Sequence, residues 1–212
     1  MNTTATSASH SNSAAISSSR DPFDLALAGL RADPSAAEIE ALLDHTGVGD
    51  GYGVVDGPIG ATWVAHNDHG VAFAFVTNDE DEFRTRHAAR LPRRLRRAAV
   101  PDEVATAIAA SDGSGLLVDL RHTAPFQRAV LEATRGVPGG ETRSYGWVAE
   151  RIGKPKAVRA VGSALGHNPI PLVIPCHRIV AATGKMTGFS GPGGVATKVK
   201  LLALEGAQLL AE

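Results

Sequence analysis

The chain has a single cysteine, Cys176, among 212 residues. No internal disulfide can therefore hold the fold together, so its stability must come from a buried core. A chain of this length can bury such a core in one large domain or two small ones. Unpaired cysteine suits a reducing compartment, and we expect a cytoplasmic, bacterial-type location. No apolar run approaches the ~20 residues that span a bilayer, so we expect no membrane partner.

The neighbours of this cysteine suggest chemistry. Residues 174–179 read Ile-Pro-Cys-His-Arg-Ile. A lone cysteine is usually an inert, buried hydrophobe, but a thiol near pKa 8.5 becomes nucleophilic beside a base or a positive charge. Adjacent side chains of a regular strand point to opposite faces. Pro175 instead predicts a bend that turns Cys176 and His177 toward one cavity, and we interpret Cys176 as a nucleophile whose pKa is lowered.

Charge is distributed unevenly along the chain. The net charge is −1, but residues 116–212 hold 12 Lys and Arg against 6 Asp and Glu, whereas residues 1–115 hold 9 against 16. A polyanion would therefore be attracted to the half of the chain that carries the cysteine, and this attraction would be weak and salt-dependent. Residues 1–20 lack the regions of a secretory signal and read as a disordered tail, although an organelle transit peptide stays open.

The residue pattern predicts an α/β chain with three parts: a tail over 1–20, an α/β domain over 21–115 and a second domain over 116–212. Residues 111–115 contain Gly and Ser and are interpreted as the linker. The first domain is expected to contain β-rich stretches over 53–66 and 71–77 joined by a turn at 67–70, and helices over 34–44, 79–90 and 101–110. Five arginines over 90–97 suggest a solvated helix face or an auxiliary phosphate contact.

The second domain is predicted to be mostly helical. A helix over 125–134 has proline in its first turn. Ser144 caps a helix that ends near Arg151, a turn follows at 153–155, and another helix runs over 156–165. Two short helices around such a turn suggest a helix-turn-helix, a motif that also occurs in proteins that never touch DNA. Small residues on the second helix would let its backbone approach a groove, with Arg159 as the one long side chain.

Several separated segments resemble the O6-alkylguanine-DNA alkyltransferase (methylated-DNA–protein-cysteine methyltransferase) family. They are Thr142–Ala149, Lys154–Arg178, Thr187–Gly191 and Lys200–Gly206, in that order. The likeness is strong over 116–212 and weak over 52–100. It implies a ribonuclease-H-like N-terminal α/β domain and a helical C-terminal domain with a winged-helix-like helix-turn-helix. It also implies a monomer that takes an alkyl group irreversibly from O6-alkylguanine, and less readily from O4-alkylthymine, in double-stranded DNA, without a cofactor.

The resemblance assigns catalytic roles. Cys176 is the nucleophile, His177 takes its proton directly or through water, and Glu205 orients His177. Glu205 alone would read as a solvated helix cap. Asn168, otherwise a turn residue before Pro169, orders the nucleophile.

Other residues are assigned to substrate and DNA. Tyr145, Ile179, Phe189 and Ser190 form the guanine pocket, in which Ser190 donates to the departing O6. Phe189 stands where the family commonly has tyrosine, and Pro192 interrupts the usual glycines, so the range of substrates stays open. Arg159 fills the gap left by an extruded base, although it could equally be a surface ion-pair partner. Tyr145, Ser144 and Gln127 are expected to contact DNA.

Two alternative functions compete with this interpretation. An alkyltransferase-like lesion sensor would lack the cysteine, so Cys176 argues against it. A thiol hydrolase would use the same Cys-His pair but would leave the Arg159 helix unexplained. We expect no metal site, since His66 and His69 have no cysteine nearby.

Overall fold

The computed structural model describes residues 49–186, 188–189 and 191–207, together with 34–35, 37–39 and 42. The chain divides into two units, Met1–Gly47 and Val48–Glu212. In the first unit, residues 37–39 and 42 are helical, and Ser35 and Glu38 exchange the hydrogen bonds of a capping box. The rest of the helix predicted over 34–44, and the predicted tail over 1–20, lie outside the described residues. All elements below belong to the second unit.

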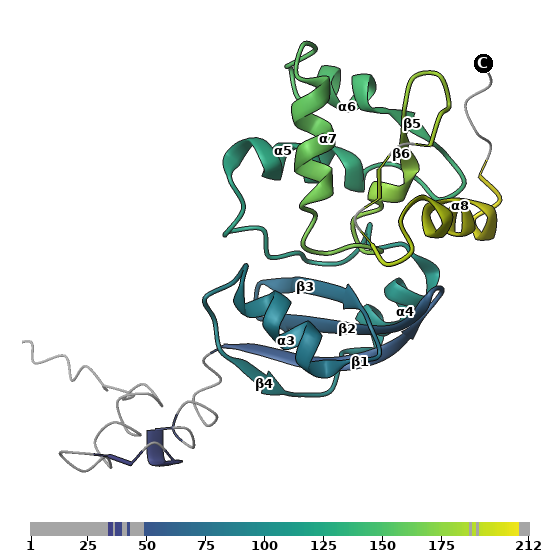
Figure 1. Cartoon of the computed structure of the whole chain (residues 1–212). Helices are drawn as coiled ribbons and strands as arrows, with labels where there is room; N and C mark the ends of the chain where they lie inside the picture. Colours follow the sequence, from purple (N-terminus) through teal and green to yellow (C-terminus); the bar gives the residue numbers. More distant parts are fainter. Residues whose placement is uncertain are drawn as a thin grey trace, which may run out of the picture. The chain divides into compact units, whose positions relative to one another are not determined.

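A four-stranded sheet has the order β3-β2-β1-β4 (Figure 1). Its strands are β1 (Asp50–Gly57), β2 (Gly60–Asn67), β3 (Gly70–Val76) and β4 (Leu95–Arg97). The first three are antiparallel neighbours, and β4 pairs in parallel with β1. The turn predicted at 67–70 is confirmed, with the Asn67 side chain accepting the His69 amide at 2.8 Å. The stretch predicted over 53–66 is two strands, because a tight turn at Pro58 and Ile59 divides it.

The arginine-rich segment 90–97 is not a helix face, which corrects that interpretation. Its end forms β4, whose three residues exist as a strand only because β1 pairs with them. Arg93 lies between two buried carboxylates, with Nε 3.2 Å from Asp50 and Nη1 2.6 Å from Asp119. The alternative role of this segment, a phosphate contact, stays a prediction.

Helices cover both faces of the sheet. Alternate residues of β2 point to opposite faces, and the side chains on each face pack against helices. On one face, Trp63 packs with Tyr52 and with Phe83 of α3 (Glu80–Ala88). On the other face, Val64 shares a core with residues of α4 (Asp102–Ala110) and of the helices that follow. The helices predicted over 79–90 and 101–110 are therefore confirmed. We call β1–β4 with α3 and α4 the sheet half.

The connection from α4 to the next helix is paired with the sheet. The Val71 amide donates to the Leu117 carbonyl at 2.9 Å, and the Asp119 amide donates to the Val71 carbonyl at 2.8 Å. Gly70 permits this approach, since a Cβ there would lie 2.2 Å from the Leu117 oxygen. The division of the chain at residues 115 and 116 stays a prediction.

The helical half follows, comprising α5 (Pro125–Arg135), β5 (Arg143–Ser144), α6 (Tyr145–Arg151), α7 (Val158–Gly166), the 3₁₀ turn η1 (Cys176–Arg178), β6 (Ile179–Val180) and α8 (Gly194–Leu204). Helices α5, α6 and α7 pack against one another (Figure 1). Pro125 opens α5 and Ser144 caps α6 through the Trp147 amide at 3.0 Å, as predicted. Helix α7 begins at Val158, two residues later than expected. Across the described residues, no helix has the length and apolar character to cross a membrane.

Candidate functional site

Cys176 lies at the bottom of a pocket. It begins η1 directly after Pro175, so the chain bends there as predicted, and only 8% of its surface is exposed. His177, which was expected to face the same cavity, is not among the residues that line this pocket. The pocket is lined by side chains and backbone of α6, α7 and the loop before α8, namely Tyr145, Gly162, Leu165, Gly166, Gly188 and Phe189. Two glycines of α7 therefore form part of the wall, which leaves room for a flat group above the thiol.

Asn168 connects the end of α7 to the cysteine segment. Its Nδ2 donates to the Ile174 carbonyl at 2.9 Å, and its Oδ1 accepts the Ile170 amide at 3.0 Å. The Cys176 amide donates to the same Ile174 carbonyl at 2.8 Å. One carbonyl thus joins Asn168 to the backbone of the cysteine, as the ordering role expected for Asn168 requires.

His177 and Glu205 form a buried pair. His177 Nε2 lies 2.8 Å from Glu205 Oε1, and the imidazole is fully buried. Because the carboxylate can only accept, Nε2 carries the proton and Nδ1 is left as an acceptor. Nδ1 is buried and has no hydrogen-bond partner among the described residues. Burial lowers the pKa of His177, although Glu205 opposes that shift, so the ring is neutral and able to receive a proton.

Glu205 is held in place by Arg178, a contact that the sequence did not predict. Arg178 Nε and Nη2 lie 3.0 Å and 2.9 Å from the two carboxylate oxygens. The same guanidinium donates to the carbonyls of Val137 and Ser111. Burial would raise the pKa of Glu205, but hydrogen bonds from His177 and Arg178 lower it to about 2. Glu205 follows the last residue of α8, as a helix cap would. Its carboxylate, however, is ionised and bound to His177 and Arg178, so it is not solvated.

The resting thiol differs from the sequence expectation. Burial raises the pKa of Cys176, although a hydrogen bond with Asn168 and the charge of Lys198 act in the opposite direction. The expectation of a lowered pKa is therefore wrong for this state. The thiol and the imidazole of the next residue are therefore both neutral in the resting protein.

Lys198 is the site residue that sequence reasoning missed. It is fully buried on α8, its Nζ donates to the Ile179 carbonyl at 2.5 Å, and it lies 5.8 Å from the centre of the Tyr145 ring. Burial lowers its pKa to about 8, against the effect of Cys176. A signal existed, because Lys198 and Glu205 are seven residues apart and share a helix face with the buried Leu201 and Leu202.

Of the other residues expected in the guanine pocket, Tyr145 and Phe189 line this pocket, whereas Ile179 is fully buried and is not among its lining residues. Phe189 borders the pocket, and Gly191 must stay small because a Cβ there would lie 2.4 Å from the Phe189 ring. The Ile179 carbonyl accepts from Lys198, and the Ile179 amide donates to the Cys176 carbonyl. Ser190 lies outside the described residues, and its role stays a prediction.

The residues expected to contact DNA lie on or beside α6 and α7. Arg159 is exposed in the first turn of α7 and makes no ion pair within the described part of the chain. Ser144 Oγ is engaged in capping α6. Gln127 Nε2 donates to the His167 carbonyl at 2.9 Å and the Ala164 carbonyl at 3.4 Å, so its amide caps the end of α7. The structure thus gives Ser144 and Gln127 structural contacts, and their contact with DNA stays a prediction.

The chain matches one family model and several curated proteins in sequence. The family model described as 6-O-methylguanine DNA methyltransferase, DNA binding domain, matches residues 125–207. A methylated-DNA–protein-cysteine methyltransferase of Mycolicibacterium paratuberculosis is 57% identical over 88 residues, which are 42% of this chain and 52% of that protein. The matched part thus spans about half the length of such curated relatives.

Two solved structures cover more of the chain. The crystal structure of Mycobacterium tuberculosis OGT in complex with DNA is 35% identical with a TM-score of 0.59, covering 73% of this chain and 92% of that one. The Mycobacterium tuberculosis O6-methylguanine methyltransferase is 34% identical with a TM-score of 0.60, covering 77% and 96%.

Fold and site together define a mixed α/β protein with a buried cysteine beside a histidine–glutamate pair. With relatives of this identity and coverage, the chain belongs to the O6-alkylguanine-DNA alkyltransferase (methylated-DNA–protein-cysteine methyltransferase) family.

Proposed function

We propose that this protein repairs DNA by moving an alkyl group from O6-alkylguanine, and less readily from O4-alkylthymine, onto Cys176. The observation that carries the proposal is the sole cysteine of the chain at the bottom of a pocket, next in sequence to a buried His177–Glu205 pair. The likeness to proteins described as O6-methylguanine methyltransferases supports it.

The proposed reaction is a displacement at the alkyl carbon. The Cys176 proton passes to Nδ1 of His177, directly or through a water molecule, and Glu205 stabilises the imidazolium that forms. The sulfur then bonds to the carbon as the carbon–O6 bond breaks, and the electron pair of that bond goes to the purine. Ser190 is the proposed donor to O6. Lys198 favours the transient thiolate through its charge. The thioether product has no route back, so each chain reacts once.

The proposed substrate is a base turned out of double-stranded DNA. Cys176 is only 8% exposed, so its thiol cannot reach O6 inside a duplex and the base must enter the pocket. We propose that Arg159 fills the vacated gap, that α6 and α7 act as a helix-turn-helix of winged-helix type, and that Tyr145, Ser144 and Gln127 contribute to the interface. The exposed start of α7 supports this, as does the likeness to the Mycobacterium tuberculosis relative that was crystallised in complex with DNA.

The finer fold assignment is also a proposal. The order β3-β2-β1-β4, with antiparallel β1–β3 and a parallel β4 after a helix, supports a ribonuclease-H-like sheet half. We propose domains at 21–115 and 116–212, and a cytoplasmic monomer acting on chromosomal DNA.

Stoichiometry tests this function. After incubation with excess duplex containing O6-methylguanine, intact-mass measurement should find one added CH₂ on Cys176 and no further reaction. Cys176→Ala should lose all transfer while still binding duplex in a gel-shift assay. Repeated turnover would point to the thiol hydrolase, and binding without an adduct on the wild-type protein would point to a lesion sensor.

A further inference from the structure

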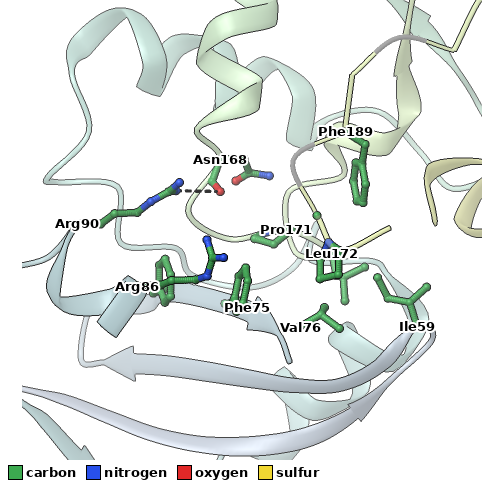
Figure 2. Close-up of a pocket in the computed structure, with 13 residues that line it drawn as sticks. Ile59, Phe75, Val76, Arg86, Arg90, Asn168, Pro171, Leu172 and Phe189 are labelled. Carbon is green, nitrogen blue, oxygen red and sulfur yellow. Dashed lines mark hydrogen bonds between the residues drawn. The ribbon is translucent and has the colours of Figure 1, made fainter. Parts of the chain in front are cut away.

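A second cavity shares Phe189 with the cysteine pocket and lies between β3 and the segments that precede and follow η1 (Figure 2). Phe75, Val76 and Leu172 form part of its apolar lining, and two arginines, Arg86 and Arg90, border it. The two arginines have different contacts. Arg86 pairs with Glu82 at 2.8 Å and stacks on the Phe75 ring at 4.3 Å, so its contacts stay within the sheet half.

Arg90 instead contacts the backbone at the end of α7. Its Nη1 lies 3.3 Å from the His167 carbonyl and, more loosely, 3.5 Å from the Asn168 carbonyl, the contact drawn in Figure 2. The next carbonyl, of Pro169, accepts the Ala74 amide of β3 at 2.9 Å. Three consecutive carbonyls, 167 to 169, therefore accept hydrogen bonds from the sheet half. A cation at this helix end also interacts favourably with the helix dipole.

This backbone leads directly to the cysteine. The side chain of Asn168 donates to the Ile174 carbonyl, which also accepts the Cys176 amide. A shift of the backbone at Asn168 would move its amide group relative to Cys176. Arg90 does not touch the pocket that holds the thiol.

We propose that Arg90 is a positioning residue through which the sheet half holds Asn168 in register with Cys176. This inference rests on the proposed function for the repair reaction, but the alignment of Asn168 and the thiol can be measured without it. The Asn168 hydrogen bond favours the thiolate, so misalignment shifts the ionisation of Cys176 upward.

The test compares Arg90→Met with Arg86→Met, a control that removes the neighbouring arginine of the same cavity. Iodoacetamide labelling of Cys176 is followed by intact mass across pH, which is unambiguous because the chain has one cysteine. Because Arg90 is an exposed residue whose two hydrogen bonds are long, we expect a modest upward shift of the labelling midpoint, about half a pH unit, in Arg90→Met. Arg90→Lys, which keeps one donor and the charge, should restore most of it, and Arg86→Met should match the wild type.

The second readout is the rate of alkyl transfer from free O6-benzylguanine. In Arg90→Met this rate should fall by about threefold at neutral pH, because a pKa higher by half a unit lowers the thiolate fraction by that factor. An unchanged midpoint and rate in folded Arg90→Met would overturn the inference, whatever its thermal stability. If circular dichroism finds that variant unfolded, Arg90→Gln is judged by the same criteria. A wild-type protein that accepts neither the benzyl group nor the methyl group of duplex O6-methylguanine would refute the proposed function alone, since the labelling shift would still decide the role of Arg90.

Discussion

At the scale of single residues, the cysteine is surrounded by groups that act at different moments. Burial keeps the resting thiol protonated, and Lys198 and Asn168 favour the thiolate once the proton leaves. His177 has an acceptor nitrogen without a partner among the described residues, and Glu205 is ionised. Reactivity therefore depends on the assembled site and not on a permanently ionised sulfur.

Lys198→Met tests this arrangement. Removing a positive charge raises the pKa of the nearby thiol further, so iodoacetamide labelling of Cys176 at pH 7, where Lys198 is charged, should slow by about tenfold, equivalent to about one pH unit. Lys200→Met, which removes an exposed lysine of the same helix, is the control and should be labelled at the wild-type rate. Equal rates at pH 7 for all three proteins would mean that Lys198 contributes no charge to the site. Since the pKa of Lys198 is about 8, the difference between wild type and variant should shrink above that pH.

At the scale of elements, α7 joins the two proposed steps, extrusion and transfer. Its first turn carries Arg159, its middle lines the pocket through Gly162, and its end leads to Asn168. The first turn of this nine-residue helix thus serves the proposed contact with DNA, and its end serves the cysteine. A substitution in the first turn should therefore affect mainly duplex substrates, whereas one at the end should also affect a free base.

Arg159→Ala should slow repair of duplex DNA far more than reaction with free O6-benzylguanine. A free base is not stacked, so a residue that fills a gap in the duplex has no role in its reaction. Unstacking costs on the order of a few kcal/mol, and each ~1.4 kcal/mol of lost assistance slows the reaction about tenfold. Arg151→Ala, an exposed arginine at the end of α6, controls for the loss of one positive charge. Equal slowing on both substrates would make Arg159 a structural residue.

Local signals predicted much of the element order, whereas contacts that depend on distant pairing escaped prediction. The turn at 67–70 and the Ser144 cap are encoded by adjacent residues, and both were predicted correctly. Strand β4 was missed because its three residues need β1 to become a strand. The roles of Lys198 and Arg178 were missed for the same reason. Arg178 donates to the distant Ser111 carbonyl, and Lys198 reaches the Ile179 carbonyl only when α8 is packed against β6.

The raised pKa of the resting thiol also could not be predicted from the sequence. Neighbours along the chain suggested a base and a positive charge, but Arg178 is turned toward Glu205 and not toward the sulfur. Burial, which only the packed structure determines, decides the direction of the shift.

At the scale of the whole molecule, a buried polar cluster links the sheet to the connection that leads into α5. Asp119 accepts from Arg93, Arg121 and Asn67. A hydrogen bond from Arg121, opposed by burial and supported by Arg93 and Asn67, holds the pKa of Asp119 well below its usual range. The cluster therefore stabilises the connection only while Asp119 is ionised.

Asp119→Asn should lower the free energy of unfolding at pH 7 by about 2 kcal/mol, because Arg121 loses its carboxylate and Arg93 loses one of the two carboxylates that flank it. The folded pKa is lower than the unfolded value of about 3.9, so this stabilisation is complete well above pH 4 and is lost as the pH falls below that value. Urea unfolding at pH 7 and pH 3 should therefore find a smaller difference at pH 3. Asp68→Asn, an exposed aspartate in the hairpin turn, should have little effect at either pH, and a pH-independent difference for Asp119→Asn would contradict the assignment.

The position of α8 has a consequence for the newborn chain. Lys198 of α8 and Glu205, which directly follows α8, both come after Cys176 in the sequence. Arg178 reaches back to Ser111 and forward to Glu205. Synthesis proceeds from the N-terminus, so the cysteine emerges from the ribosome before these groups do. Until α8 is made and docked, the thiol has neither its lysine nor an ionised partner for its histidine. Before that point the thiol lacks the burial that raises its pKa and behaves as an ordinary cysteine, so the docking of the last helix both shields the sulfur and completes the site.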